Sequence, residues 1–385
     1  MPPLTGVKVL DLTNVLAGPY CSYQLALLGA DVVKAELPGQ GDLARRLGPE
    51  ADLNRARLGA SFLAQNAGKK SIELDLKTEE GKARFEELAG EADVLLENFR
   101  AGVLDRLGFG WDRLRALNPR LVYCAISGFG QDGPMSQAPA YDQIIQGLSG
   151  MMAVTGTPDT APVRVGFPVC DTIGGLTAAL HICAALAGRE ESGQGVFLDV
   201  SMLEAAISAM GWTVSNYMVS GVETAPMGDQ NATAAPSGTF RAADGPLNIA
   251  ANRQQQFETL CRLVGRPELL TDPRFAGREA RKAHREELNK QLNAALGQRT
   301  VREWEQLLTP AGVPAARIVT VSEALELEQL AHRGFCTDLP FPDGSDRRLR
   351  VSGSGVLHDG QPLRPEAPPP RLGQHTHEPV WKSAT

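Results

Sequence analysis

Histidine is absent from the first 180 residues of this 385-residue chain, because all six histidines lie at or after His181. Chemistry carried by that half needs another residue type, since imidazole is the most common base and metal ligand near neutral pH. The six cysteines are far apart and form no C-x-x-C pair, so neither a zinc site nor a disulfide framework is indicated. His375 and His377 stand without a cysteine or carboxylate cluster, and we expect no metal there.

A surplus of positive charge is also lacking. Acidic residues (45) outnumber lysine and arginine (38), which gives a formal net charge of -7. Nucleic-acid-binding domains are usually basic, so we expect no nucleic-acid partner. The uncharged run at 205–222 is interrupted by serine and asparagine and is too polar and too short for a membrane span. The first residues show no signal-peptide pattern. We therefore expect a soluble, cytoplasmic protein that does not use a membrane.

What the chain does contain is a regular alternation of short apolar runs and amphipathic stretches. This pattern predicts an α/β fold in which helices connect the strands of a mainly parallel, Rossmann-like sheet. Proline at position 19, next to Gly18, is permitted early in a helix and marks the start of the first one. The expected strands cover residues 7–12, 31–36, 71–76, 94–96, 121–126 and 196–200.

The pattern changes after residue 200. Residues 201–218 predict one long helix that is apolar on two sides and so buried on both, and residues 219–237 read as a linker. A hairpin at 243–245 and helices from Gln254 and Arg278 predict a smaller α/β domain. The expected domains are a large one at 1–205 completed by 331–385, a helix and linker at 206–225, and a small one at 226–330. Prolines between 362 and 379 indicate an extended surface segment.

Several glycine motifs resemble known ligand loops. Residues 128–133 match G-x-G-x-x-G after an expected strand, but Pro134 and a loop follow where a dinucleotide site needs a helix. Residues 68–71 lack the first glycine of a phosphate loop, and no G-x-S-x-G nucleophile turn is present. We interpret these glycines as loop residues.

Asp171 precedes an apolar helix expected at 176–186. On local sequence it is an ordinary helix N-cap, the role that aspartate fills by accepting free amides of the first turn. Gly174 and Gly175 make the position less ordinary, since each glycine costs about 1 kcal/mol in a helix. One reason to keep them would be the close approach of a large ligand to the backbone.

Many short segments, in one order along nearly the whole chain, resemble class III CoA-transferases of the formyl-CoA transferase type. The matching segments are Val-Leu-Asp-Leu-Thr at 9–13, Ala-Gly-Pro at 17–19, Leu-Gly-Ala-Asp-Val-Val-Lys at 28–34, Lys-Ser-Ile-Glu-Leu-Asp-Leu at 70–76, Glu-Asn-Phe at 97–99, Leu-Asp-Arg-Leu-Gly at 104–108, Ser-Gly-Phe-Gly at 127–130, Gly-Pro at 133–134, Tyr-Asp at 141–142 and Pro-Arg-Leu-Gly-Gln-His-Thr at 370–376. The overall pattern is closer to the dicarboxylate branch, which includes succinyl-CoA-dependent enzymes.

The resemblance implies a transfer of CoA from an acyl-CoA donor, such as succinyl-CoA, to a carboxylic acid through a covalent intermediate on Asp171. An aspartate with an ordinary pKa near 3.9 would be ionised without a base, which suits a first half without histidine. Glycines near Asp171 are candidate oxyanion donors. CoA enters as a substrate, and no permanently bound cofactor is implied. The resemblance assigns CoA or substrate binding to seven further residues: Val15, Ala17, Leu74, Asn98, Phe99, Arg106 and Tyr141.

The phosphates of CoA require a local basic patch on this acidic chain. The candidates are Arg45, Arg46, Lys69, Lys70, Arg100 and Arg106. Two departures from the formyl-CoA transferase pattern argue against formate and oxalate as the substrate pair. Residues 228–235 lack a glycine run, and Leu37 stands where an arginine is expected.

Two other interpretations remain open. The family includes α-methylacyl-CoA racemases, which carry a histidine where this chain has Tyr141, and a tyrosine with a pKa near 10 is a poor partner for two-way proton exchange. A non-enzymatic CoA-binding protein is the third interpretation, and the carboxylate at 171 argues against it. The resemblance also implies a homodimer whose chains interlock like rings.

Overall fold

The computed structural model describes residues 1–381, and the chain divides into two compact units. The larger unit comprises residues 1–151, 164–222 and those from Glu328 onward, and the smaller comprises 152–163 and 223–327. Two of the expected boundaries differ from this division. Residues 152–163 lie in the smaller unit, and the expected linker at 206–225 lies mostly in the larger one.

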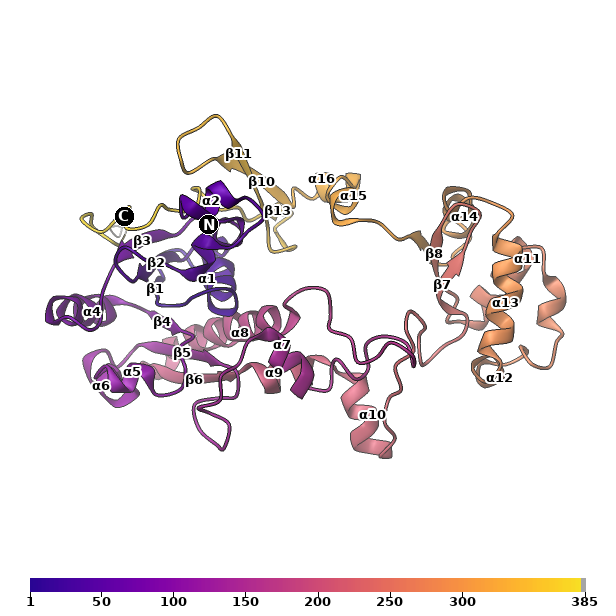
Figure 1. Cartoon of the computed structure of the whole chain (residues 1–385), viewed down its shortest axis with the longest axis horizontal. Helices are drawn as coiled ribbons and strands as arrows, with labels where there is room; N and C mark the ends of the chain where they lie inside the picture. The colour runs from indigo at the N-terminus through magenta and orange to yellow at the C-terminus, as the bar shows by residue number, and fades with distance from the viewer. Residues whose placement is uncertain (382–385) are drawn as a thin grey trace. The chain divides into compact units, whose positions relative to one another are not determined.

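A six-stranded parallel sheet forms the centre of the larger unit (Figure 1). The strand order is β3-β2-β1-β4-β5-β6, the doubly wound arrangement in which ligands bind beyond the carboxyl ends of the strands. All six expected strands are present, although the third ends earlier than expected. Their bounds are β1 Lys8–Asp11, β2 Asp31–Glu36, β3 Lys70–Glu73, β4 Val94–Glu97, β5 Val122–Ser127 and β6 Val196–Ser201.

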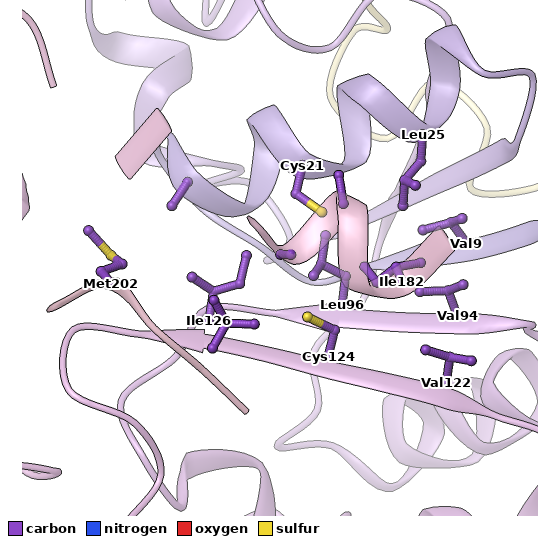
Figure 2. Packing of buried hydrophobic residues seen from close by; sticks show 14 of the residues in the cluster. Val9, Cys21, Leu25, Val94, Leu96, Val122, Cys124, Ile126, Ile182 and Met202 are labelled. Carbon is purple, nitrogen blue, oxygen red and sulfur yellow. The ribbon is translucent and has the colours of Figure 1, made fainter. Parts of the chain in front are cut away.

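Helices cover both faces of this sheet. On one face, α1 (Ala17–Leu27) and α8 (Val169–Ser192) pack against alternate residues of the strands. Figure 2 shows Cys21 and Leu25 of α1 and Ile182 of α8 beside the valines of β1, β4 and β5. On the other face, α4 (Glu79–Glu91) and α6 (Trp111–Leu117) bury Phe85, Leu88 and Leu114. The burial of these apolar side chains is what fixes the helices on the sheet.

Helix α8 begins at Val169, seven residues before the expected start, so Gly174 and Gly175 lie inside it. A Cβ atom at Gly175 would lie 2.5 Å from the carbonyl oxygen of Ala17 in α1, and one at Gly174 would lie 3.0 Å from Cγ of Met202. The glycines therefore allow close packing of α8 on α1 and α9. This packing is a reason for both glycines that needs no ligand, and the expectation that they admit a ligand to the backbone stays a prediction. Of the described helices, α8 alone is long and apolar enough to cross a membrane.

The long helix expected at 201–218 is two helices, α9 (Met202–Ala209) and α10 (Trp212–Ser220). Gly211, with φ of 53°, separates them because it adopts a backbone conformation that other residues rarely take. Helix α9 buries Met202, Ala205 and Ala206, whereas no residue of α10 is buried within the single chain. The expected burial of both sides is therefore absent at α10 within one chain, and its burial between subunits stays a prediction.

The C-terminal segment returns to the larger unit. It forms the hairpin of β10 (Cys336–Pro340) and β11 (Arg348–Ser352), and then follows strand β3. There the amide of Ser71 donates to Nδ1 of His375 at 3.1 Å, and the amide of His375 donates to the carbonyl of Ser71 at 2.9 Å. His375 thus joins the tail to the sheet. Within residues 1–381, no group of three or more metal-ligating side chains occurs.

Several short elements complete the larger unit. Helix α7 (Asp142–Leu148) precedes α8 and contributes to the site described below. The others are η1 Leu43–Arg46, α2 Ala51–Arg55, α3 Ala60–Leu63, α5 Val103–Arg106, α16 Glu328–His332, β12 Leu357–His358 and β13 Gln361–Pro362.

The smaller unit has a three-stranded antiparallel sheet and its own apolar core. The expected hairpin joins β7 (Ser237–Arg241) to β8 (Pro246–Ala250), and β9 (Ala315–Arg317) pairs with β8. Helices begin at Gln254 and Arg278, as the sequence predicts. The helices of this unit are α11 Gln254–Leu263, η2 Pro267–Leu270, α12 Arg278–Ala283, α13 Arg285–Leu296, α14 Val301–Leu308 and α15 Val321–Leu325.

Candidate active site

A cavity of about 350 Å³ opens beyond the carboxyl ends of β1, β4 and β5. The loops that follow these strands form its walls, together with early residues of α1, α8 and α9 and with Tyr141, which precedes α7. Parallel sheets place ligands at this edge because the loops after neighbouring strands converge there. The lining residues are Asn14, Val15, Leu16, Ala17, Leu43, Asn98, Phe99, Arg100, Ile126, Ser127, Gly128, Ser136, Ala138, Pro139, Ala140, Tyr141, Asp171 and Met202.

Among the described residues, Asp171 is the only acidic one that lines this first cavity. It is the third residue of α8, after the capping residue Pro168, so the interpretation of Asp171 as an N-cap is wrong. The side chain is half-buried, and within residues 1–381 its carboxylate forms no hydrogen bond or ion pair. Such an unpartnered carboxylate is open to a ligand that enters the cavity.

The electrostatics around Asp171 favour its neutral form. Burial raises the pKa of Asp171 to about 7, and the negative charge of Asp142 adds to the rise. Asp142 is buried at the start of α7, where its carboxylate accepts from the amide of Cys170 at 2.8 Å and from Nε2 of Gln146 at 2.6 Å. Arg164 lies 3.7 Å from Asp142, and its side chain is 44% exposed. Asp171 is therefore about half ionised near pH 7, contrary to the expectation of an ordinary pKa.

The loop between β1 and α1 forms one wall of the cavity and is held by two polar side chains. Asn98 accepts from the amide of Asn14 and donates to its carbonyl, both at 2.8 Å. The amide of Val15 donates to Oδ1 of Asp42 at 2.9 Å. Val15 has a φ of 67°, so the loop turns in a conformation unusual for a valine.

A second cavity of about 280 Å³ shares Asn14 and Phe99 with the first. It lies between the ends of β1, β2 and β3 and is mostly apolar. Of the lysines and arginines in residues 1–381, Lys77 alone lines it. The other lining residues are Leu12, Thr13, Ala35, Glu36, Leu37, Gly41, Asp42, Leu74, Asp75, Leu76, Val103 and Leu107.

The structure brings most of the predicted site residues together. Leu74 and Arg106 are the two that do not line the first cavity: Leu74 lines the second, and Arg106 lies exposed on α5. The remaining predicted residues line the first cavity: Asp171, Val15, Ala17, Asn98, Phe99 and Tyr141.

The expected oxyanion donors have a different role. The amides of Gly174 and Gly175 lie beyond the first turn of α8, where backbone amides bond within the helix. The expectation that these glycines supply free amides is therefore wrong.

Three of the expected phosphate-binding residues are committed elsewhere. Arg45 is buried and pairs with Glu36 at 2.6 Å, and Lys69 is buried between Asp11 and Ser22. Lys70 donates to the carbonyl of Val380 near the end of the chain. Burial and pairing leave these cations unavailable to a ligand.

Sequence reasoning did not single out Asn14, Lys77 or Asp142 for the site. Asn14 stands directly before Val15, and Asp142 directly after Tyr141, so proximity to predicted residues was an available signal. Lys77 follows strand β3 and carries no such signal. Its position became visible only from the cavity that it lines.

Comparison with known proteins agrees with this geometry. The family model of CoA-transferase family III matches residues 4–376. An acetyl-CoA:oxalate CoA-transferase of Acetobacter aceti is 39% identical over 94% of this chain and 89% of its own. A succinyl-CoA:glutarate CoA-transferase of Mus musculus is 35% identical over 98% of this chain and 85% of its own.

Among solved structures, a CaiB/BaiF family protein from Brucella suis is 35% identical and superposes with a TM-score of 0.84 over 97% of both chains. The sequence relatives and this structural match each extend over nearly the whole chain, so the resemblance that the short motifs indicate is confirmed. The chain belongs to CoA-transferase family III and is a class III CoA-transferase.

Proposed function

We propose that this enzyme moves CoA from succinyl-CoA to a second dicarboxylic acid through covalent intermediates on Asp171. The observation that carries the proposal is the unpartnered, half-buried carboxylate in the first cavity. The two sequence relatives described above are named for oxalate and glutarate, which are both dicarboxylic acids, and the mouse relative is named for succinyl-CoA.

The reaction divides one exchange into four substitutions at carbonyl carbons. A carboxylate oxygen of Asp171 first attacks the thioester, which forms a mixed anhydride and releases CoA thiolate. The thiolate then attacks the Asp171 carbonyl, which gives an aspartyl-CoA thioester and releases the donor acid. The acceptor carboxylate attacks this thioester, forming a second anhydride and releasing the thiolate again. Attack of the thiolate on the acceptor acyl carbonyl yields the new acyl-CoA and restores the Asp171 carboxylate.

The raised pKa of Asp171 bears on the first step. Only the ionised carboxylate attacks, so activity should rise with pH as the group ionises through a pKa of about 7. A desolvated carboxylate is also a stronger nucleophile than a hydrated one, because water no longer stabilises its charge. Burial thus lowers the ionised fraction and increases the reactivity of that fraction.

The two adjoining cavities suit the two ends of an acyl-CoA. In this arrangement the acyl thioester occupies the first cavity beside Asp171, and the nucleotide part of CoA occupies the second. Arg100 lines the first cavity and Lys77 the second, and neither lining includes another lysine or arginine from the part of the chain that the structure describes. We assign the phosphate contacts to these two residues in place of the buried cations.

The exposed surface of α10 supports a homodimer. Trp212, Met218 and Val219 are 80%, 79% and 89% exposed in the single chain, which is costly for apolar side chains that lie on one short helix. A second copy that covers α10 would remove this surface from water, as the interlocked dimer implied by the family resemblance would do. Light scattering of the purified protein tests this assignment, and a monomer at all concentrations would contradict it.

The racemase alternative lacks a proton-transfer partner for Asp171. No histidine lines the first cavity, and the histidine position of the racemases holds Tyr141, which is 72% exposed. Proton exchange at an α-carbon needs two groups whose pKa values lie near the working pH.

Trapping separates the transferase, racemase and binding-protein alternatives. The protein is incubated with succinyl-CoA and a panel of dicarboxylic acids, treated with borohydride or hydroxylamine, and digested for mass spectrometry. We expect modification at Asp171 and new acyl-CoA products. The matched control is Asp132→Ala, which changes an exposed carboxylate outside both cavities. Transfer that persists in Asp171→Ala would exclude the covalent pathway. Deuterium uptake at the α-carbon without transfer would favour the racemase, and CoA binding without any turnover would favour a binding protein.

A further inference from the structure

Val15 adopts a backbone conformation that a valine rarely takes. Its φ of 67° lies in the left-handed region, where a β-branched side chain is in close contact with its own backbone. Residues held in this way persist only when neighbouring groups stabilise them, and they are concentrated at ligand sites. Val15 lines the first cavity, so its conformation decides the shape of the wall that faces the substrate.

The group that holds Val15 is the carboxylate of Asp42. Asp42 is 2% exposed, and its Oδ1 accepts from the amide of Val15 at 2.9 Å and from that of Ala44 at 2.8 Å. Its Oδ2 lies 3.0 Å from Nζ of Lys34, which is completely buried. Nζ of Lys34 also donates to the carbonyl of Thr13 at 2.6 Å. The buried pair therefore bonds to the loop at Thr13 and at Val15, on either side of Asn14.

We propose that Asp42 is a positioning residue for acyl-CoA, and that Lys34 fixes the Asp42 carboxylate in place. The proposal rests on the function proposed above, because it takes the first cavity as the acyl-CoA site. Without the carboxylate, the Val15 peptide would turn to the negative φ that valine favours, and the cavity wall would move. Asp171 lies on α8, away from this loop in sequence, so its reactivity should change little.

Asp42 and Lys34 could instead contribute to folding alone, as many buried ion pairs do. The two roles differ in what they predict for kinetics. A purely structural pair lowers stability without changing KM in the molecules that remain folded, whereas a positioning pair raises KM for acyl-CoA more than it lowers kcat.

Asp93→Ala is the matched control for Asp42→Ala. Asp93 also accepts from a backbone amide, that of Lys8 at 2.8 Å, and pairs with a cation, Arg189 at 2.8 Å, but it lines neither cavity. We expect Asp42→Ala to raise KM for succinyl-CoA roughly tenfold to a hundredfold, the range for a lost hydrogen bond to a charged group. We expect its kcat to stay within about threefold, and Asp93→Ala to keep the wild-type KM. Equal KM values in the two variants would overturn the proposal.

A second measurement uses the strain at Val15 itself. Glycine adopts a positive φ without strain. Val15→Gly therefore removes part of the backbone strain at position 15 that the hydrogen bond from the Val15 amide to Asp42 offsets. The Asp42→Ala change should therefore raise KM several-fold less in a Val15→Gly background than in the wild type. Equal effects in both backgrounds would show that Asp42 acts elsewhere. If Asp42→Ala does not fold, Asp42→Asn replaces it in both comparisons, with Asp93→Asn as control.

These outcomes are distinct from a failure of the proposed function. If the wild-type enzyme transfers no CoA from succinyl-CoA, the proposed substrate is wrong, and calorimetric titration with CoA then reports on Asp42. Weaker CoA binding in Asp42→Ala than in Asp93→Ala would still support the positioning role. Equal binding would reject it.

Discussion

Two groups of carboxylates in the larger unit differ in their partners. Beside β1 and β2, three buried carboxylates each pair with a buried cation. The pairs are Asp11 with Lys69 at 3.4 Å, Glu36 with Arg45 at 2.6 Å and Asp42 with Lys34 at 3.0 Å. At the start of α7 and α8, buried Asp142 and half-buried Asp171 lie near one another, and within residues 1–381 the only ion pair of either is that of Asp142 with the partly exposed Arg164.

The difference shows how partners decide whether an aspartate is structural or reactive. Burial by itself would raise the pKa of Asp11, but Lys34, Lys69 and two hydroxyl groups lower it below its usual value. Burial raises the pKa of Asp171 to about 7 because no cation opposes it. The first aspartate is stabilised as an ion and is chemically inert. The second is the one that can react with a substrate.

The largest effect is expected from Asp171→Ala, which removes the reactive carboxylate. Transfer from succinyl-CoA should fall by at least about 10⁴-fold, as it does when a nucleophile is removed from other covalent enzymes. Steady-state assays with the Asp132→Ala control measure this loss. Activity within tenfold of the wild type would mean that the carboxylate at the start of α8 is not the reactive group.

In the paired region, Arg45→Met should lower stability more than it affects the reaction. It leaves the Glu36 carboxylate buried without its cation, a loss of about 3–5 kcal/mol in the free energy of unfolding. Urea unfolding followed by circular dichroism measures the change. The matched control is Arg46→Met, which removes an exposed neighbour of Arg45. A loss below about 1 kcal/mol would show that the paired region is not held by its ions.

A smaller effect is expected at Lys77, a cation that lines the second cavity. Lys77→Gln should raise KM for acyl-CoA by roughly threefold to tenfold, and the increase should shrink at high salt because phosphate contacts are screened. Lys77→Arg keeps the charge and should stay near wild type. A KM unchanged in both variants would remove Lys77 from the phosphate site.

The smallest effect is a shift in pH dependence on changing Asp142→Asn. Burial is the main cause of the raised pKa of Asp171, and the Asp142 charge is the second cause, so removing that charge lowers the pKa. The rising limb of kcat/KM against pH should move to lower pH, because more of Asp171 is ionised under acidic conditions. Asp132→Asn should leave the profile in place. A shift to higher pH in Asp142→Asn would contradict the assigned electrostatics.

The sequence predicts the strands of the large sheet well because each one is a short apolar run between turn residues. It predicts the helices after β5 less well. Helix α8 starts at Val169, and its two glycines pack against the Ala17 carbonyl and the Met202 side chain, contacts that have no local signature in the sequence. The break between α9 and α10 at Gly211 was also not predicted, since a glycine within an apolar run indicates either a break or a packing site.

For the site, the order of short motifs locates Asp171 and most of the cavity wall. The motifs do not predict which basic side chains are free to bind CoA, because that depends on ion pairs formed in the folded chain. Arg45 and Lys69 are basic residues near the expected CoA loops, yet their partners come from strands β1 and β2 and leave them buried. The same limit explains the wrong expectation of an ordinary pKa at Asp171. A pKa is set by burial and neighbouring charges, and neither can be read from the residue itself.

The backbone contact between Gly175 and the carbonyl of Ala17 has a consequence for redesign of this enzyme. Asp171 and Ala17 both line the first cavity and belong to two helices that approach closely at Gly175, so this backbone contact helps to fix the position of the nucleophile. Substitutions at lining positions such as Pro139 or Met202 can then alter which acid is accepted while the nucleophile stays in place. Any side chain added at position 175 would instead push α8 away from α1 and move the nucleophile for every substrate at once.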